Sequence, residues 1–600
     1  MPTNRLERVA DIVARYMVED LELDTVFAVT GAGIMHLTDG LARENRLKVI
    51  FPHHEQTSSM AVDAYSRYSG KVGVSFYSTG PAATNAITGL AGCWQDSVAT
   101  IFISGQVKRS ESTEFRGMTS VRQFGVQELN ILPIVKSITK HASQVQNPEL
   151  ILYELDRAKF AASSGRPGPV WLEIPMDVQS SLVETSKLTR FSPPAVHHDA
   201  HLSVVALQKL ISESRRPVVV AGQGVRLSGS REDFLSWAER AGLPFVTPYL
   251  GVDVSPKSHP NYIGVTGVKG DRAANWAMQS SDLIIAMGTS MHVSVTGYDY
   301  QNFAPDAKKV IVNIDALAGA QGNVNYDLRV IADIHHVIKD LETLEARLPE
   351  PHKAWAERLK SVSLSYPVIE SDYDASVGSN IYEVVGMVND LLEPNDCVIS
   401  DAGSAFYCVS QALALNDSSQ RYITSGAMAT MGFSLPAAIG AAVAGAHRVI
   451  AYTGDGSLQQ TLQEISLMAL HRLNIKLLVL NNDGYLSIRA SQKNYFDGRL
   501  FGTDEKTGVL FPDLAKIADA YGVDYYKIDK PSDFSEGARL LSENGPLLME
   551  IKCPPNQPII PTVGSKLSLE GVLSSSGIGQ MNPAMSDFEH DKVMRFLKGD

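Results

Sequence analysis

The sequence predicts an α/β fold in which parallel strands alternate with crossover helices. Short apolar runs rich in β-branched residues alternate with longer helical patterns. Each run ends in Gly, Asn, Asp, Ser or Thr, as expected where a buried parallel strand meets a loop. Two polar linkers divide this alternation into blocks of ordinary domain size. Because ligands in such sheets bind beyond the carboxyl ends of the strands, these ends are the first place to look for function.

The apolar runs that we expect to be strands occur from the first block to the last. Between them lie stretches with helical periodicity, which parallel strands need as connections. The expected strands are residues 25–30, 99–104, 216–222, 282–288, 308–315, 448–456 and 475–482.

Two segments are predicted to be linkers. Residues 189–201 contain a Pro-Pro pair, and residues 364–380 are polar and rich in acids. We therefore expect a first domain, a central domain, a third domain and a C-terminal extension that serves as a lid or an interface strap. Their predicted ranges are 1–188, 200–363, 380–556 and 557–600.

Composition excludes several classes of protein. The 600 residues are 44% hydrophobic and 20% charged, which fits a folded globular chain rather than a disordered one. A net charge of −13 argues against nucleic-acid binding. The N-terminus lacks the apolar core of a signal peptide, and no run reaches the roughly 18 apolar residues of a membrane span. Four scattered cysteines suggest neither a disulfide framework nor a zinc site, so we expect a cytoplasmic protein.

The most informative motif lies in the third block. A strand ends at Gly454-Asp455-Gly456, a helix of about 16 residues is expected next, and a second strand ends at Asn482. One βαβ unit brings these two strand ends side by side. The Asp455 carboxylate, the Asn482 amide oxygen and the Gly484 carbonyl are hard oxygen ligands that suit Mg²⁺. The flanking glycines and the helix start favour a bound phosphate.

Several motifs, taken together, resemble one family. The GDG and NN pairs with their βαβ spacing resemble the diphosphate–metal motif of thiamine-diphosphate enzymes. Glu55 in HHEQ, residues 78–85 (STGPAATN), residues 127–141 and residues 424–442 (TSGAMATMGFSLPAAIGAA) resemble further motifs of that family, in the same order. The chain is identified as a member of the acetolactate synthase-like group.

The resemblance implies a fold, cofactors and partners. It implies three doubly wound parallel-sheet domains: pyrimidine-binding, central and diphosphate-binding. It also implies thiamine diphosphate and Mg²⁺, and a homodimer or homotetramer with active sites between subunits. The implied catalytic residues are Glu55 and Gln127, and the implied metal ligands are Asp455, Asn482 and Gly484. The implied cofactor-binding residues are Gly31, Glu55, Pro81, Asn85, Ala402, Gly403, Ser404, Ala429, Met431, Gly454, Asp455, Gly456, Ser457, Asn482, Gly484, Tyr485 and Leu486.

Three of these residues have specific expected roles. Glu55 is expected to bond N1′ of the cofactor pyrimidine and make its 4′ nitrogen basic. Met431 is expected to wedge the cofactor into a bent shape, since a thioether fills an irregular gap without competing polar atoms. Gln127 is placed near the substrate. His53 and His54 are left out because adjacent residues on a strand point to opposite faces.

Departures from the family pattern bear on the substrate. Ser491 stands where acetolactate synthases have a Trp, and Val126 stands where they have a Phe, so the acceptor site is expected to be wider. Residues 107–128 lack the His-His pair of simple 2-oxo acid decarboxylases. We therefore expect a carboligase that decarboxylates a 2-oxo acid, with pyruvate the first candidate, and transfers the two-carbon unit to a carbonyl acceptor. A decarboxylase or C–C lyase without ligation, and a catalytically silent homologue, remain the alternatives.

Whether FAD binds is left open. Acetolactate synthases use arginines in a central-domain stretch that corresponds to residues 288–297, and this chain has none there. Other residues suit a dinucleotide or its phosphates: Gly222, Gly224, Asp315, Lys269 and Arg272.

Overall fold

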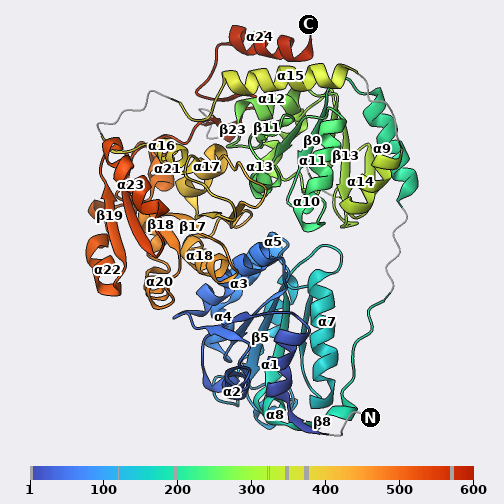
Figure 1. Ribbon diagram of the computed structural model, residues 1–600, viewed down its shortest axis with the longest axis vertical. Coiled ribbons are helices and arrows are strands. Elements are labelled where there is room, and N and C mark those ends of the chain that lie inside the picture. Colours follow the sequence, from blue (N-terminus) through green and yellow to red (C-terminus); the bar gives the residue numbers. More distant parts are fainter. Residues whose placement is uncertain are drawn as a thin grey trace.

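The computed structural model describes residues 5–118, 120–194, 200–320, 322, 324–344, 350–370, 377–567 and 573–599. These residues form three six-stranded sheets, and every neighbouring pair of strands within the three is parallel. Helices cover the sheets, and Figure 1 shows the three parts as separate lobes. The predicted α/β class is confirmed.

The N-terminal sheet has the strand order β3-β2-β4-β5-β7-β6. Its strands are β3 (Lys48–Ile50), β2 (Thr25–Ala28), β4 (Gly73–Tyr77), β5 (Thr100–Gln106), β7 (Val170–Pro175) and β6 (His141–Gln144). Its helices include α1 (Val9–Glu19), α2 (Met35–Arg43), α3 (Glu55–Ser69), α4 (Pro81–Asn85), α5 (Ile87–Gln95), α6 (Leu132–Val135), α7 (Ile151–Ser163) and α8 (Met176–Ser180). A short antiparallel pair, β1 (Leu6–Arg8) and β8 (Leu182–Glu184), joins the start and end of this lobe.

The central sheet has the order β11-β10-β9-β12-β13-β14. Its strands are β11 (Tyr262–Val265), β10 (Phe245–Thr247), β9 (Pro217–Ala221), β12 (Leu283–Met287), β13 (Lys308–Asn313) and β14 (Leu328–Ile331). Its helices include α9 (His201–Glu213), α10 (Gly224–Leu227), α11 (Arg231–Arg240), α12 (Arg272–Ser280), α13 (Val293–Thr296), α14 (Ile334–Thr343) and α15 (Glu350–Ser365).

The C-terminal sheet has the order β16-β15-β17-β18-β20-β19. Its strands are β16 (Arg421–Thr424), β15 (Cys397–Ser400), β17 (Val449–Gly454), β18 (Ile475–Asn481), β20 (Leu547–Lys552) and β19 (Asp524–Ile528). Its helices include α16 (Ile381–Asn389), α17 (Gly403–Ala412), α18 (Ser434–Val443), α19 (Asp455–Leu458), α20 (Ile465–Leu470), α21 (Leu486–Tyr495), α22 (Leu514–Tyr521) and α23 (Phe534–Ser542).

All seven expected strands are present in these sheets, with ends shifted by a few residues. Apolar β-branched runs suffice to locate such strands because both faces are covered by helices, so each strand is buried throughout. The exact domain boundaries stay predictions.

The N-terminal and C-terminal lobes share one hydrophobic core. Helix α3 packs against α18, and the fit is close: a Cβ on Gly440 would lie 2.0 Å from the carbonyl oxygen of Ala61. The junction therefore requires glycine at position 440, and it fixes these two lobes relative to each other.

The C-terminal extension packs on the central lobe, with α24 (Asp587–Lys598) beside α15 and α12 (Figure 1). The extension also contains the antiparallel pairs β21 (Thr562–Val563) with β24 (Met581–Asn582), and β22 (Ser565–Leu567) with β23 (Leu573–Ser575). Val563, Ile578, Met581 and Leu597 are buried in the same cluster as Trp276. The extension thus completes the central core, and its expected role as a lid or interface strap stays a prediction.

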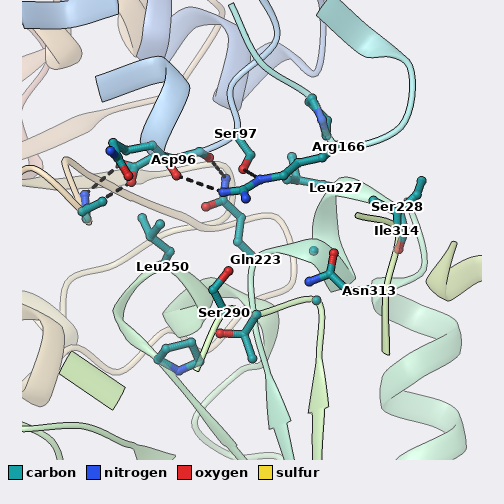
Figure 2. A pocket seen from close by; sticks show the side chains of 18 of the residues that line it. Asp96, Ser97, Arg166, Gln223, Leu227, Ser228, Leu250, Ser290, Asn313 and Ile314 are labelled. Carbon is teal, nitrogen blue, oxygen red and sulfur yellow. Dashed lines mark hydrogen bonds between the residues drawn. The ribbon is translucent and has the colours of Figure 1, made fainter. Parts of the chain in front are cut away.

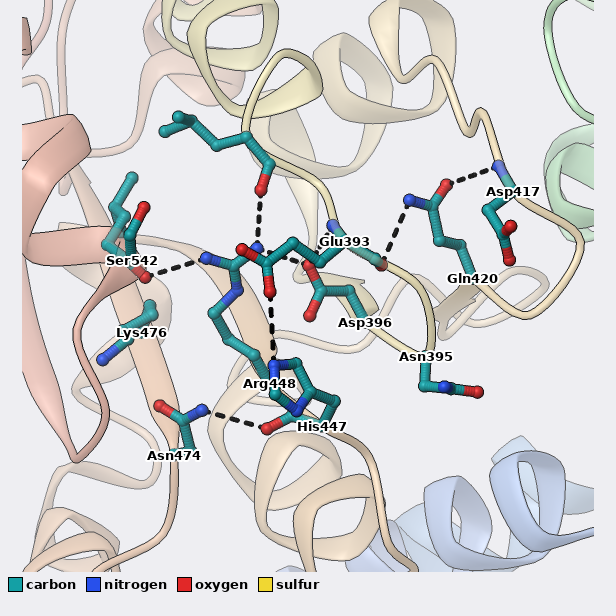
Figure 3. Close-up of polar contacts among 12 residues, drawn as sticks. Glu393, Asn395, Asp396, Asp417, Gln420, His447, Arg448, Asn474, Lys476 and Ser542 are labelled. Carbon is teal, nitrogen blue, oxygen red and sulfur yellow. Dashed lines mark hydrogen bonds and ion pairs between the residues drawn. The ribbon is translucent and has the colours of Figure 1, made fainter.

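A buried ion pair stabilises the C-terminal sheet at the edge opposite its strand carboxyl ends. Arg448 contacts Asp396 at 2.5 Å and donates to the carbonyls of Leu391 and Leu541 (Figure 3). Because both charges are buried and paired, we assign this cluster a structural role at the start of β15 and β17.

Within the described residues, no helix is long and apolar enough to cross a membrane. The four cysteines are buried and free.

Candidate active site

The carboxyl ends of three adjacent strands form one half of the candidate site. β15, β17 and β18 are neighbours, and the chain order reverses between β15 and β17, where doubly wound sheets bind ligands. Helices α17, α19 and α21 start in the segments that follow these strands. The predicted residues that these segments bring together are Ala402, Gly403, Ser404, Gly454, Asp455, Gly456, Ser457, Asn482, Gly484, Tyr485 and Leu486.

Two helix N-termini approach each other at this edge. A Cβ on Gly403, the first residue of α17, would lie 3.4 Å from the Oγ of Ser487 in the first turn of α21. The Ser487 hydroxyl is buried and has no hydrogen-bond partner among the described residues. Free amides and an unpaired hydroxyl suit a diphosphate, since helix N-termini favour anions.

Asp455 is the first residue of α19 and contacts the segment that carries the other two predicted metal ligands. Its carboxylate accepts from the amide of Gly456 at 2.8 Å and from the amide of Gly484 at 2.9 Å. Its side chain is 4% exposed, and burial raises its pKa to about 6. Arg489 fixes the next strand end by donating to the carbonyl of Asn482 at 2.6 Å.

This arrangement fits Mg²⁺. Asp455 belongs to none of the ion pairs among the described residues, and the charge of Arg489 only partly offsets the effect of burial on its pKa. A Cβ on Gly454 would meet nothing within 4 Å, which leaves space beside the carboxylate. The described residues contain no cluster of three His, Cys, Asp or Glu for a metal, and the predicted site does not need one. Its donors are one carboxylate, one amide oxygen and one carbonyl, with water and phosphate oxygens to complete the octahedron.

The segment that carries Ala429 and Met431 lies beside this edge. Ala429 has a left-handed backbone, with φ +48°, and its amide donates to the carbonyl of Ser425 at 2.8 Å. Met431 is 36% exposed, which is unusual for a methionine next to a core. The predicted role of Met431 as a wedge stays a prediction.

The second half of the candidate site lies in the N-terminal lobe. Glu55 is the first residue of α3, and its carboxylate accepts from the side-chain amide of Asn85 at 2.9 Å. Pro81 begins α4, of which Asn85 is the last residue. Gly31 follows β2, and a Cβ there would lie 2.5 Å from Ser78 Oγ, after β4. These predicted residues meet where the chain order of the N-terminal sheet reverses, between β2 and β4.

Gln127 joins this second half through the backbone. Its φ of +61° places it in the left-handed region, which costs a non-glycine residue free energy. A Cβ on Gly80, itself at φ +62°, would lie 2.5 Å from the Gln127 carbonyl oxygen. Only glycine at position 80 allows Gln127 this place next to Pro81.

The two halves of the candidate site lie in the two lobes that share one hydrophobic core. No hydrogen bond or ion pair among the described residues connects the Glu55 set with the Asp455 set. Exposed apolar side chains lie near both halves: Met35, Phe51, Phe115, Phe124, Val126, Met428, Met431 and Ile488.

A cavity of about 740 Å³ lies where the central lobe meets the other two (Figure 2). Gly224, Gly288 and Asn313 border it at the carboxyl ends of β9, β12 and β13. Arg166, from the N-terminal lobe, is the one lysine or arginine in its described lining. The guanidinium bonds Ser97 at 2.8 Å and lies 3.6 Å from Asp315.

Of the residues named for a dinucleotide, Gly224 belongs to the described lining of this cavity, and Gly222, Asp315, Lys269 and Arg272 do not. Lys269 lies 4.4 Å from the ring centre of Tyr407, and Arg272 donates to the carbonyls of Met581 and Pro583 in the C-terminal extension. Arg272 thus binds the C-terminal extension, a contact that the local sequence does not indicate. The cavity has the volume for a nucleotide but only Arg166 for its phosphates, so FAD stays a prediction.

Two further expectations about local structure are wrong. The chain after Gly456 is not one long helix: α19 ends at Leu458, and a 3₁₀ turn precedes α20. His53 and His54 do not lie on a strand. They precede α3, and His54 caps it by accepting from the amide of Gln56, while the His53 amide donates to Glu464. These capping and bridging roles explain the histidines without chemistry.

Sequence reasoning missed three residues that shape the site. Asp401, directly after β15, accepts from the amides of Gly432 and Ser434. It shows the same signal as Asp455, a polar residue at a strand end, and was open to prediction. Asp96 gave no local signal, because the segment that it bonds lies in another lobe. Arg489 bonds the carbonyl of Asn482, close in sequence, and also that of Pro555, which only the folded chain brings near.

Comparison with known proteins agrees with this geometry. Residues 7–144 match the thiamine pyrophosphate enzyme, N-terminal TPP binding domain; residues 204–341 match the central domain; and residues 401–551 match the C-terminal TPP binding domain. The chain belongs to the thiamine pyrophosphate (thiamine diphosphate) enzyme family.

Within that family, the chain is related over almost its full length to acetolactate synthase large subunits. It is 31% identical over 573 residues to the probable acetolactate synthase large subunit of Methanocaldococcus jannaschii, covering 92% of this chain and 94% of the relative. It is 28% identical over 556 residues to the acetolactate synthase large subunit of Lactococcus lactis, covering 92% and 93%. The chloroplastic acetolactate synthase of Arabidopsis thaliana is 29% identical, with 94% and 84% covered.

Proposed function

We propose that this chain is a thiamine-diphosphate-dependent carboligase that decarboxylates a 2-oxo acid, with pyruvate the first candidate, and transfers the two-carbon unit to a carbonyl acceptor. The observation that carries the proposal is the contact of the Asp455 carboxylate with the amide of Gly484 at the carboxyl ends of the neighbouring strands β17 and β18, with Asn482 in the same segment as Gly484. The full-length similarity to acetolactate synthases supports it.

When bound, thiamine diphosphate supplies a carbon nucleophile and takes up the electrons released by decarboxylation. The chain's own residues bind and orient it. Asp455, Asn482 and the Gly484 carbonyl hold Mg²⁺, and the starts of α17 and α21 bind the diphosphate. The buried, unpaired hydroxyl of Ser487 supports that placement.

Glu55 and Met431 prepare the reacting part of the cofactor. Glu55 holds a proton at its carboxyl group against the pyrimidine N1′, and Asn85 orients that carboxyl by its hydrogen bond at 2.9 Å. Met431 supports the ring from the partly exposed side, where its thioether offers contact without a competing hydrogen bond. Gln127 faces the substrate on a backbone fixed by Gly80.

The active site is proposed to form between two copies of the chain. The Glu55 half and the Asp455 half lie in different lobes, and no hydrogen bond or ion pair among the described residues links them, which is compatible with a second copy that brings its Glu55 half to an Asp455 half. The exposed apolar side chains near both halves suit burial in such a homodimer, alone or within a homotetramer.

The acceptor is proposed to be larger than a second pyruvate. Ser491 is exposed on α21, and its hydroxyl donates to the carbonyl of Ser487, so it leaves open the volume that a Trp occupies in acetolactate synthases. Val126 is 82% exposed on the loop that carries Gln127. A sugar-derived ketone or another bulky carbonyl compound fits such a site.

A decarboxylase or lyase without ligation is the second candidate function. It needs a proton donor at the carbon that loses CO₂. Residues 107–128, which include Gln127, contain no histidine that could donate this proton. A catalytically silent homologue would be favoured by loss of Glu55, Asp455 or Asn482, and all three are present.

The test is turnover of pyruvate with thiamine diphosphate and Mg²⁺, with and without aldehyde and ketone acceptors, with products followed by NMR. We expect CO₂ release and a new C–C bond, and a Glu55→Gln variant that binds cofactor but loses at least about 100-fold in turnover. Acetaldehyde as the sole product would favour the decarboxylase. Absence of turnover with every 2-oxo acid tried, despite bound cofactor, would favour the silent homologue.

A further inference from the structure

Two buried carboxylates hold the two ends of the segment that carries Ala429 and Met431. At the far end, Asp401 accepts from the amides of Gly432 at 2.9 Å and Ser434 at 3.2 Å. At the near end, Asp96 accepts from the amides of Gly426 at 2.9 Å and Ala427 at 3.0 Å. Asp401 belongs to the same lobe as the segment, whereas Asp96 follows α5 in the N-terminal lobe.

Asp96 acts together with Arg67. The Arg67 guanidinium lies 2.9 Å from the Asp96 carboxylate and also donates to the Thr424 carbonyl at 2.9 Å. This buried pair therefore contacts three nearly consecutive backbone groups: the Thr424 carbonyl and the amides of Gly426 and Ala427. Hydrogen bonds to charged partners are the stronger kind, so the pair sets the course of the chain entering the segment.

The same ion pair network contains an internal comparison. Asp63, one turn before Arg67 on α3, contacts its guanidinium at 2.6 Å and is buried like Asp96. Asp63 has no hydrogen bond to the segment among the described residues; its other partner is the Cys93 thiol. If Asp96 served only to neutralise Arg67, replacing Asp96 and replacing Asp63 would have the same effect on the segment.

We propose that Asp96 is a positioning residue, which sets from the N-terminal lobe the backbone of the segment that places Ala429 and Met431 against the cofactor. This inference rests on the proposed role of that segment in binding thiamine diphosphate. Asp96 also lies at the wall of the cavity in Figure 2, where its carbonyl accepts from the side chain of Gln223 at 3.3 Å.

The first test needs no cofactor. Asp96→Asn and Asp63→Asn each remove one carboxylate from Arg67, so both lower the thermal midpoint. Hydrogen–deuterium exchange of the cofactor-free chain should differ: peptides covering residues 425–433 are expected to exchange about 10-fold faster in Asp96→Asn and to stay within about twofold of wild type in Asp63→Asn. Equal exchange in the two variants would overturn the proposal.

The second test measures the bound cofactor. Under saturating thiamine diphosphate and Mg²⁺, the exchange of its C2 hydrogen for deuterium is followed by NMR after acid quench. We expect Asp96→Asn to slow this exchange about 10-fold, with Asp63→Asn close to wild type. An unchanged rate in Asp96→Asn would contradict the positioning role even if the segment loosens.

The outcomes also separate this inference from the proposed function. Failure of the wild-type chain to bind the cofactor or exchange its C2 hydrogen would overturn the proposed function itself. If the wild-type chain exchanges the C2 hydrogen at a normal rate and the Asp96→Asn and Asp63→Asn variants give equal results, only the role of Asp96 is overturned. If Asp96→Asn does not fold, Asp96→Glu keeps the charge beside Arg67 but shifts the carboxylate by one methylene, and the same two results are expected of it.

Discussion

Glu173 is a buried carboxylate behind the Gln127 loop. Its two oxygens accept from the side-chain amides of Gln106 at 2.9 Å and Gln144 at 2.6 Å. Gln106 in turn accepts from the hydroxyl of Thr79, next to Gly80. Burial without a cation partner raises the pKa of Glu173 to about 7. These hydrogen bonds connect Glu173 through Gln106 to Thr79, next to the Gly80 that contacts the Gln127 backbone.

This raised pKa predicts a pH-dependent stability. Glu173 ordinarily titrates near 4.5, so its contribution to folding is full below that pH and is lost as the pH rises through about 7, because the fold must then bury a charge. The loss amounts to about 3 kcal/mol. Glu173→Gln avoids it, so we expect the thermal midpoint of the variant relative to wild type to rise by about 5 °C from pH 5 to pH 8.

The matched control is Glu232→Gln on the surface of α11, which should shift the midpoint equally at both pH values. If the thermal midpoints of wild type and Glu173→Gln differ by the same amount at pH 5 and at pH 8, the predicted rise in the pKa of Glu173 is wrong.

Individual site residues were predictable where the signal was local. Asp455, Asn482 and Gly484 stand at strand ends, and parallel strands bring those ends together. Asp96 and Glu173 could not be found in this way, since a buried carboxylate owes its role to partners that only the folded chain brings near.

The element that presents Gln127 is a loop rather than a helix or strand. Residues 107–118 and 120–128 follow β5 and contain a 3₁₀ turn at Arg109–Glu111. The Glu128 carboxylate ties this stretch together: it accepts from the amide of Thr113 at 2.5 Å and from those of Phe124 and Gly125. Although burial raises the pKa of Glu128, these bonds and the Thr113 hydroxyl lower it on balance. One side chain thus orders a long surface segment.

Glu128→Gln is expected to loosen this loop. An amide has one acceptor oxygen in place of two and cannot satisfy all four donors. We expect trypsin to cleave after Arg116 or Arg122 at least about 10-fold faster in the variant, because cleavage requires local opening. Mass spectrometry of the fragments gives the site and the rate.

Glu111→Gln in the same loop is the control, since Glu111 pairs with Lys108 at 3.6 Å and bonds no distant part of the loop. Equal cleavage rates in Glu128→Gln, Glu111→Gln and wild type would mean that other contacts order the loop.

Elements were predicted well where burial is complete and poorly where the chain bends. Strands such as β12 and β18 are buried at nearly every position, so composition alone locates them. The helical pattern after Gly456 is interrupted at Thr461, whose hydroxyl donates to the carbonyl of Gly432. That tertiary contact overrides the local preference for one continuous helix.

At the scale of the whole molecule, one buried junction joins the three lobes. Arg421 of β16 contacts Asp253 of the central lobe at 2.7 Å and donates to the carbonyl of Arg67 in the N-terminal lobe at 2.7 Å. Arg226 adds a second contact to Asp253. With the α3–α18 packing, this junction keeps the Glu55 half and the Asp455 half of one chain in fixed places.

A mixed dimer tests whether the site forms between copies. A Glu55→Gln chain and an Asp455→Ala chain are each expected to be inactive. In a dimer with one chain of each kind, one site combines the intact Glu55 of one chain with the intact Asp455 of the other. We expect about half of the wild-type activity from heterodimers purified by two different affinity tags.

If both residues of a site came from one chain, the mixed dimer would have no intact site. As a control, wild-type chains are separated and recombined by the same procedure and must regain activity. If they do and the heterodimers are still inactive, a site between copies is contradicted.

The packing of the C-terminal extension has a consequence for synthesis on the ribosome. Met581 and Leu597 complete the core around Trp276, yet they are translated only after the whole third lobe. The N-terminal lobe can fold as it emerges, whereas the core of the central lobe stays incomplete until the third lobe and the extension have been made. Messages cut short after β20 would yield polypeptides with an open central core, and a bulky fusion partner placed after Lys598 would sit against the closing helix.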